Sequence, residues 1–394
     1  MPSTFTRNAI VLGLLTAIGP FAIDMYLPAL PAISADLKAS TAATQATLMV
    51  FFVAFGICQL AYGPVSDMVG RKPPLYVGLS LFVLGSIGCV FSPTIGWLIV
   101  FRFIQGIGAS VVMVIPRAVI RDLHTGLDAT RLMSLVMLVF SVSPILAPLI
   151  GSALIVPFGW RAVFVAITIA AALGLLLVAF VLAETRPPKQ RIRSGLKSVL
   201  AGYGFLLRDP RFLAPTFIGA FGMASFFAFL ASSSFIYIDH FGLTPTQYSL
   251  AFAVNAIGLI GASQFSAYLA RRFRVSRVVS TAVACYTAAA VLLFATTAAG
   301  VTNLAVLMTL LFLAFAWLGL VIPLTMVLAL EEHGPIAGMA SALGGTLQML
   351  TGAAIIVLVS VFFDGTALPM VATISLCALA AFTLSRLILL RHKA

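Results

Sequence analysis

The sequence contains little charge: Asp, Glu, Lys and Arg together make up 9% of its 394 residues. A soluble domain carries about 25% charged residues, so a soluble fold could not hide this much apolar surface. Histidine and cysteine are also scarce, with four of each. The cysteines stand singly in apolar stretches, and the histidines lie in expected loops or near the C-terminus, so neither type forms the closely spaced sets that bind metals. We therefore expect no metal site and no cofactor.

Apolar runs fill most of the chain, and hydrophobic residues make up 61% of it. Each run is close to the roughly 20 residues that a helix needs to cross a bilayer. The runs are continuous rather than alternating, which indicates helices rather than a β-barrel. We expect an all-α membrane protein with about twelve transmembrane helices. The expected spans are 9–32, 44–64, 75–92, 96–118, 132–154, 160–183, 213–235, 248–269, 278–298, 302–329, 337–362 and 366–388.

The basic residues fall almost entirely on one side of the expected membrane. With the N-terminus in the cytoplasm, 20 of the 23 Lys and Arg residues are cytoplasmic, and only Lys38 and Arg161 lie outside. Cytoplasmic loops are enriched in Lys and Arg, so this orientation is favoured. We expect a multi-pass protein of the cell inner membrane, with both termini cytoplasmic. The net charge of +12 then reflects topology and not nucleic-acid binding.

The longest polar stretch separates two sets of six spans. We expect an N-terminal half (1–183), a cytoplasmic linker (184–212) and a C-terminal half (213–394). The tripeptide Val-Ile-Pro precedes a histidine in both halves, at 114–116 and at 321–323. Paired halves of this kind place a substrate cavity near the middle of the bilayer in many transporters.

The loop after the second span carries the most specific motif. Residues 63–72 supply Gly63, Asp67, Gly70 and Arg71 at fixed spacing. A glycine at position 70 allows a tight turn, and the carboxylate of Asp67 can accept from arginines or cap a helix N-terminus.

This loop resembles the signature G-x-x-x-D-x-x-G-R-[KR] of the major facilitator superfamily. The resemblance implies the two-half major-facilitator fold and a conformational latch that steadies the outward-open state. We expect Asp67 to act through Arg71, through Arg121, or through the start of the eleventh span near Met339. The alternative is a basic loop that only sets topology.

Arg102 is the only basic residue deep inside an expected span, and its surroundings resemble the R-x-x-Q-G motif of the same superfamily. A basic residue at a helix centre costs at least about 2.5–3.5 kcal/mol on insertion scales, so it needs a partner or a wet cavity. Asp24 is the only acid well inside a span. At 1.5 Å per residue, both lie roughly 9–12 Å below the outer surface. We expect them to pair, either as a structural ion pair or as the site that couples transport to protons.

The segments 24–31, 117–122, 159–164 and 184–185 together resemble the Bcr/CflA drug-resistance family of drug:proton antiporters. The resemblance covers the first half and the start of the linker, and is thinner in the second half. In the fifth span, Pro148 and Gly151 match the antiporter motif G-x-x-x-G-P-x-x-G-G, while three of its glycines are replaced by small residues. The alternative for this span is close helix packing alone. The resemblance implies proton-driven export of antibiotics.

Candidates for lining a substrate cavity are Asp24, Tyr26, Phe226, Phe227, Asn255 and Gln348. The aromatic and amide residues serve equally well as packing or interhelical hydrogen-bond groups. We expect the protein to export small amphipathic drugs in exchange for protons. We also expect it to be a monomer that contacts membrane lipid and binds no nucleic acid. The alternatives are a transporter of one specific metabolite with the same fold and, remotely, a membrane enzyme. For an enzyme, the only clustered candidates are Glu331, Glu332 and His333, which lack a nucleophile or metal partners.

Overall fold

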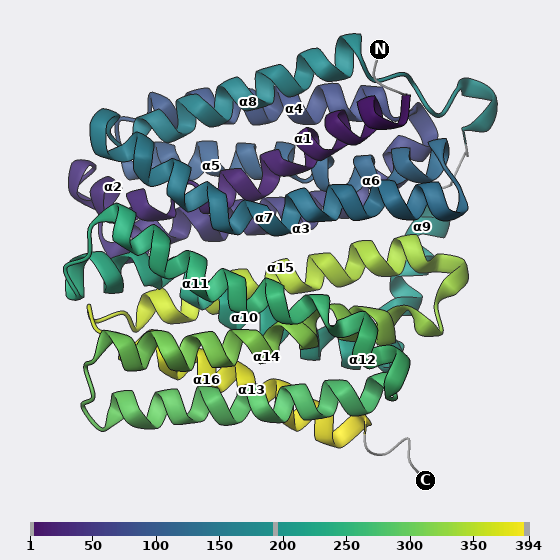
Figure 1. Ribbon diagram of the computed structural model, residues 1–394. Coiled ribbons are helices and arrows are strands. Elements are labelled where there is room, and N and C mark those ends of the chain that lie inside the picture. Colours follow the sequence, from purple (N-terminus) through teal and green to yellow (C-terminus); the bar gives the residue numbers. More distant parts are fainter. Residues whose placement is uncertain (1–3, 192–195, 390–394) are drawn as a thin grey trace. The chain divides into compact units, whose positions relative to one another are not determined.

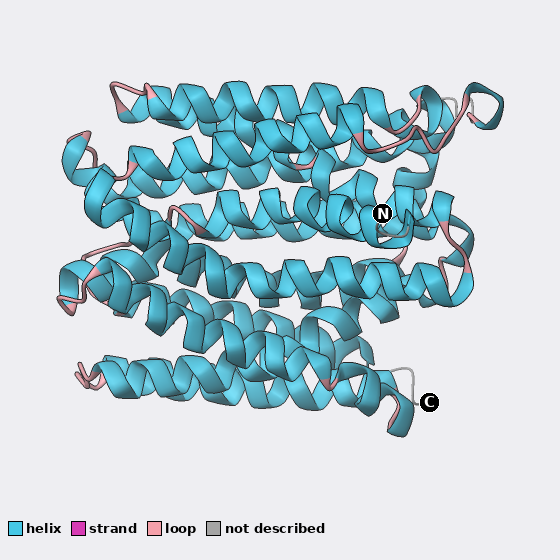
Figure 2. Ribbon diagram, turned by 45° about the horizontal axis from the view of Figure 1, so that its top comes forward, coloured by secondary structure: helices cyan, strands magenta, loops and turns pink. Residues whose placement is uncertain are grey.

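The computed structural model describes residues 4–191 and 196–389, which form long helices joined by short loops (Figure 1, Figure 2). Twelve helical segments of the described chain are long and apolar enough to cross a membrane. The first six are built from α1 (Thr4–Asp24), α2 (Leu30–Asp36), α3 (Thr41–Val69), α4 (Lys72–Val90), α5 (Ile95–Ala109), α6 (Val111–Leu123), α7 (Gly126–Phe158) and α8 (Arg161–Phe180). The last six are built from α10 (Pro210–Ser234), the π-helix η3 (Phe235–His240), α11 (Pro245–Gln264), α12 (Ser266–Arg272), α13 (Val275–Ala298), α14 (Leu304–Glu331), α15 (Ala337–Val361), α16 (Leu368–Leu384) and the π-helix η5 (Ser385–Leu389). The expectation of about twelve membrane-crossing helices is confirmed.

The chain divides into two compact units. The first comprises Met1–Ala39 and Val50–Val199, and the second comprises Ser40–Met49 and Leu200–Ala394. In the first unit α1 packs against α7, and α4 packs against α5 and α8. In the second, α10 packs against α15, and α13 packs against α14 and α16. The same packing therefore recurs in both units. Counted within each unit, the first span packs against the fifth, and the third span packs against the fourth and the sixth.

The expected linker is partly helical. It contains the short 3-10 helix η2 (Pro188–Gln190) and the helix α9 (Leu196–Leu206). The division between the two units falls inside α9. The segment after α8 therefore belongs to the first unit, and most of α9 belongs to the second.

The first span is broken, although the sequence suggested one continuous helix over 9–32. Helix α1 ends at Asp24, a short 3-10 helix η1 (Leu27–Ala29) follows, and α2 begins at Leu30. Pro28 and Pro31 explain the break, because proline has no N–H to donate and its ring clashes with the preceding helical turn. The break frees carbonyl groups at the end of α1 from helical partners in mid-span, although that of Phe21 still accepts from the N–H of Met25 at 3.1 Å.

Glycines bring the backbones of the first unit close together. A Cβ atom at Gly106 of α5 would lie 2.5 Å from the carbonyl oxygen of Phe51 in α3, and one at Gly85 of α4 would lie 2.7 Å from the amide nitrogen of Gln105. Small residues permit such close helix contacts in membranes. They hold the polar side chains of α5 against α1, α3 and α4.

Candidate functional site

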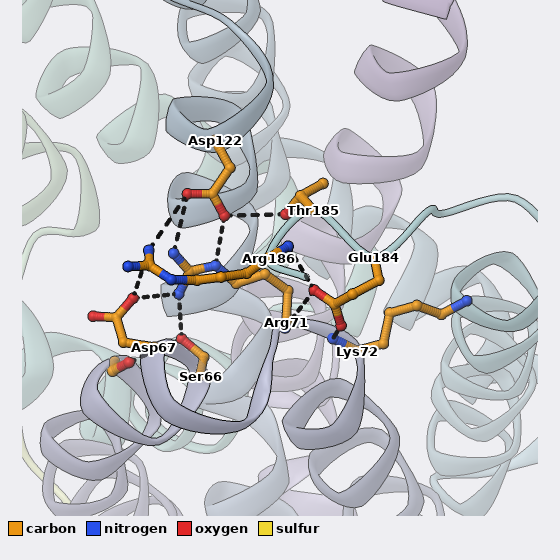
Figure 3. Close-up of polar contacts among 9 residues, drawn as sticks. Ser66, Asp67, Arg71, Lys72, Asp122, Glu184, Thr185 and Arg186 are labelled. Atoms are coloured by element: carbon orange, nitrogen blue, oxygen red, sulfur yellow. Dashed lines mark hydrogen bonds and ion pairs between the residues drawn. The ribbon is translucent and has the colours of Figure 1, made fainter. Parts of the chain in front are cut away.

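Arg71, in the turn between α3 and α4, is the centre of a network of charged groups (Figure 3). Its guanidinium binds Asp122 of α6 through two bonds, from Nε to Oδ2 at 2.7 Å and from Nη2 to Oδ1 at 3.1 Å. Its Nη1 donates to Asp67 Oδ1 at 2.8 Å and to Ser66 Oγ at 2.7 Å. Only 4% of the Arg71 side chain is exposed. Two-bond pairs between arginine and carboxylate are among the strong charge-assisted contacts of proteins.

Burial also affects the protonation of Arg71. Burial by itself lowers its pKa, but the hydrogen bonds and charges of Asp122 and Asp67 outweigh that effect and raise the pKa above the usual value. The guanidinium therefore stays charged.

A second arginine reaches the same two acids. Arg186 Nη1 lies 3.1 Å from Asp67 Oδ1 and 3.8 Å from Asp122 Oδ1. Next to it, Thr185 donates from Oγ1 to Asp122 Oδ2 at 3.0 Å. The chain that follows α8 is thus tied into the network of the α3–α4 turn, and these contacts form a four-residue set, Asp67, Arg71, Asp122 and Arg186, which we call the charged latch.

Glu184 fastens the backbone of the same turn (Figure 3). Its Oε1 accepts from the N–H groups of Arg71 and Arg186, and its Oε2 accepts from the N–H of Lys72, each at 2.9 Å. Lys72 is the first residue of α4, so the carboxylate lies where the helix dipole favours negative charge. Burial acts to raise the pKa of Glu184, but the three N–H donors and Arg191 hold it below the usual range.

Gly70 is required at this turn for two reasons. Its φ is +102°, a backbone conformation that side chains disfavour. A Cβ atom there would also lie 2.8 Å from Glu184 Oε2. The glycine of the motif therefore makes room for the glutamate.

The structure brings together some of the expected latch residues and not others. Asp67 and Arg71 form the expected ion pair, and Gly63 lies one turn earlier, where its carbonyl accepts from Ser66. Arg121 is exposed and forms no ion pair among the described residues, so its expected contact with Asp67 is absent; the adjacent Asp122 takes part instead.

Met339 begins α15 in the second unit, where it lies against Gly202 of α9. Its expected part in a latch stays a prediction. Sequence reasoning did not identify Asp122, Glu184 and Arg186 as network residues. The signal available was that acids are rare, with 11 in the chain, and that 122 and 184 lie at the same expected membrane face as the motif.

Arg102 is fully buried in the first unit. Its Nη1 donates to the carbonyl of Ala22 in the last turn of α1 at 3.0 Å, and also to Gln105 Oε1. Gln105 in turn donates to Ser86 Oγ at 2.7 Å. The guanidinium carbon lies 4.3 Å from the centre of the Tyr26 ring and 4.4 Å from that of Phe51, distances at which cation–π attraction is appreciable.

Asp24 lies beside this arrangement but is not part of it. It is the last residue of α1 and is 5% exposed. The ion pair expected between Asp24 and Arg102 is not formed in the described part of the chain. The break in α1 offers Arg102 a carbonyl oxygen instead, and aromatic rings occupy its other faces. Their joint role in proton coupling stays a prediction.

Gly151 of α7 packs directly on the break. A Cβ atom there would overlap the carbonyl oxygen of Met25. Pro148 lies one turn earlier, inside the uninterrupted helix α7. Gly151, one of the two residues that match the antiporter motif, therefore faces the region where α1 ends.

The expected cavity residues are buried within their own units. Tyr26 is fully buried against Phe164. In the second unit, Phe226 packs among the rings of Phe229, Phe252 and Phe315 at 5.5–6.3 Å. The other three make the following contacts: Phe227 fits against Gly352 of α15, Asn255 donates to Ala251 at 3.3 Å, and Gln348 lies near Gly219. Their role in binding substrate stays a prediction.

A helical membrane protein with a broken first span, a buried acid at the break and a charged turn after the second span has the features of a transporter. Comparison with known families agrees. Residues 12–357 match the Major Facilitator Superfamily, and the chain belongs to this superfamily. It is a multi-pass membrane transporter and not an enzyme.

Several relatives carry informative names. The chain is 37% identical to the uncharacterized MFS-type transporter YdgK of Bacillus subtilis over 92% of this chain and 90% of that one. It is 32% identical to multidrug resistance protein D of Escherichia coli, over 86% and 84%. It is 31% identical to a bicyclomycin resistance protein homolog of Haemophilus influenzae, over 67% and 65%. These relatives support the resemblance to drug:proton antiporters drawn from the motifs.

Solved structures of low sequence identity share the fold. A bacterial homolog of the human lysosomal transporter Spinster superposes with a TM-score of 0.74 at 15% identity, covering 98% of both chains. A D-xylose-proton symporter gives a TM-score of 0.73 at 16% identity, covering 96% of this chain and 97% of the other. The major-facilitator fold expected from the motifs is confirmed.

Proposed function

We propose that this protein exports small amphipathic drugs or antibiotics in exchange for protons. It acts as a monomer in the cell inner membrane, with both termini in the cytoplasm. The names of the multidrug and bicyclomycin resistance relatives and the excess of basic residues at one membrane face support this proposal.

The observation that carries proton coupling is the environment of Asp24. An acid at a helix break in mid-span, 5% exposed and without a bonded partner in the described chain, can ionise only when water or a counter-charge reaches it. An acid of this kind within the membrane marks a functional site by default. Asp24 is therefore the group that takes up and releases the transported proton.

Arg102 provides the counter-charge in this proposal. Its Nη1 is occupied by Ala22 and Gln105, but Nε and Nη2 have no partner among the described residues. The N–H groups of these two nitrogens are available to an ionised Asp24 when α1 shifts relative to α5. Protonation of Asp24 removes that attraction and leaves Arg102 on the Ala22 carbonyl.

The candidate groups for substrate contact are Tyr26 in the first unit and, in the second, Phe226, Phe227, Asn255 and Gln348. Their aromatic and amide groups suit amphipathic molecules. The charged latch steadies one of the transport states through the α3–α4 turn.

The test is drug accumulation by proteoliposomes under an imposed pH gradient. The variant Asp24→Asn keeps the size of the side chain but cannot release a proton. We expect it to lose accumulation driven by the gradient while retaining exchange of preloaded for external drug, which needs no net proton movement. The control Asp36→Asn changes an acid of the same span whose ion pair with Arg161 is exposed, and it should transport normally.

Accumulation at wild-type rates by Asp24→Asn would exclude Asp24 as the coupling site. A panel of antibiotics in the same assay distinguishes a drug exporter from a transporter of one metabolite, since the latter would move none of them.

A further inference from the structure

His333 lies in the turn between α14 and α15, with a contact on each ring nitrogen. Nδ1 is 2.9 Å from the carbonyl oxygen of Ala329, and Nε2 is 3.0 Å from Asp209 Oδ2. The residue is 4% exposed. Both partners belong to the second unit: Ala329 lies in the last turns of α14, and Asp209 is the N-cap residue of α10, where it also accepts from the N–H of Arg211 at 2.9 Å.

Neither partner of His333 has a proton to offer. A backbone carbonyl only accepts, and an ionised carboxylate only accepts. Burial acts to raise the pKa of Asp209, but the Arg211 N–H, the contact with His333 and the charge of Arg211 hold it below the usual range. Both ring nitrogens of His333 must therefore donate. A neutral imidazole has only one N–H, so this geometry requires the doubly protonated ring.

We propose that His333 is a second proton-binding site of this protein, and that its doubly protonated ring positions the α14–α15 turn against the start of α10. Loss of one proton leaves a lone pair facing either the carbonyl oxygen or the carboxylate. One of the two contacts is then repulsive, and the turn is released from α14 or from Asp209.

An acid and an ion pair lie near His333. Asp209 faces the ring directly, and Arg211 of α10 is paired with Glu332 at the end of α14 at 2.6 Å. That pairing directs the arginine charge toward Glu332. The ring of Phe212, which is fully buried, lies 5.7 Å from that of His333 in an edge-to-face arrangement, and Phe205 of α9 lies 6.3 Å away.

The first unit contains a matching histidine without the acid. His124 follows the tripeptide at 114–116 as His333 follows the one at 321–323. Its ring packs edge to face with Phe5 of α1 at 5.6 Å, much as His333 packs with Phe212 of α10. Its Nε2 has no partner among the described residues. His124 is therefore a natural control, with the same place in the repeat but no reason to hold a second proton.

This inference goes beyond the proposed coupling at Asp24. His333 lies outside the membrane spans, and its protonation can be observed without any transport. A failure of the drug assay would therefore leave the proposal untouched, and the reverse also holds.

The direct test is the nitrogen NMR spectrum of protein labelled with ¹⁵N-histidine in lipid bilayers at pH 7.5, with any affinity tag removed. The chain has only four histidines, so single substitutions assign the signals. We expect one pair of imidazolium-type signals, lost in His333→Gln and kept in His124→Gln. In Asp209→Asn, which preserves the helix cap but not the charge, the same ring should give neutral-type signals. A wild-type spectrum in which the signals removed by His333→Gln are of the neutral type would overturn the proposal.

Discussion

Glu184 provides a sharp test of how the α3–α4 turn is held, through the substitution Glu184→Gln. The side chain keeps its length, but one of its two oxygens becomes an amide group that cannot accept a hydrogen bond. Oε1 serves Arg71 and Arg186, while Oε2 serves Lys72. Even in the less damaging orientation of the amide, the N–H of Lys72 therefore loses its hydrogen-bond acceptor.

The cost follows from the number of bonds lost. A hydrogen bond to a charged group contributes roughly 1.5–3 kcal/mol net, so losing the Lys72 contact alone should ease local opening by at least about that amount. The remaining two bonds weaken as well, because their acceptor becomes neutral. Since about 1.4 kcal/mol corresponds to a factor of ten, amide exchange in this turn should accelerate at least tenfold.

Hydrogen exchange followed by mass spectrometry measures this directly. Pro73 and Pro74 have no amide hydrogen, and the first nitrogen of a peptide is a free amine, so the peptide 70–74 reports on only the amides of Arg71 and Lys72. The control Glu331→Gln changes an exposed acid and should leave the exchange of this peptide unaltered. Exchange at the wild-type rate in Glu184→Gln would refute the role of the carboxylate as a backbone clamp.

The effect also has a definite dependence on pH. Because the pKa of Glu184 is lowered in the folded state, its stabilising effect is full above the ordinary glutamate pKa of about 4.3 and is lost as the pH falls through the lowered value. After correction for the intrinsic exchange rate, wild-type protection at 70–74 should be constant from pH 8 to pH 5. It should fall only in more acidic medium.

Two further predictions concern packing and charge geometry. Gly151→Ala should destabilise the protein by roughly 2–4 kcal/mol, as overpacked and backbone-shifting substitutions do, because the added methyl overlaps the Met25 carbonyl oxygen. The control Gly126→Ala has open space around it and should cost about 1 kcal/mol from its positive φ alone. Thermal melting in detergent compares the two variants. Arg71→Lys keeps the charge but loses the two-bond fork to the acids of the latch, so it should lower the melting temperature by several degrees. The control Arg121→Lys changes an exposed residue and should leave the melting temperature unchanged. Equal effects of the two substitutions would show that charge alone matters.

The sequence was sufficient to place Asp24 and Arg102 at similar depth, and the structure agrees, since Arg102 bonds to Ala22, two residues from Asp24. Depth along a helix does not determine which way a side chain points. The break after Asp24 decided the outcome, because it supplied a carbonyl oxygen as an alternative acceptor. The prolines that cause the break were visible in the sequence, but their effect on the partner of Arg102 depended on the packing of α5 against α1.

The charged latch illustrates the same limit. Asp67 and Arg71 are four residues apart at the end of one helix, so their pairing could be expected locally. Arg121 and Asp122 are neighbours in the sequence, but successive residues point about 100° apart around a helix of 3.6 residues per turn. Only the packing of α6 determines which of them faces Arg71. Glu184 lies 112 residues from Lys72, and no local pattern indicates that contact.

The two units hold different interhelical turns with different chemistry. In the first, the cations are Arg71 and Arg186, and an arginine side chain stays charged across the whole physiological range. In the second, the proposed cation is His333, whose ring can lose a proton. Loss of that proton would loosen the α14–α15 turn, whereas the arginines keep the α3–α4 turn in place. Proton binding outside the membrane spans, separate from Asp24, would thereby act on one unit only.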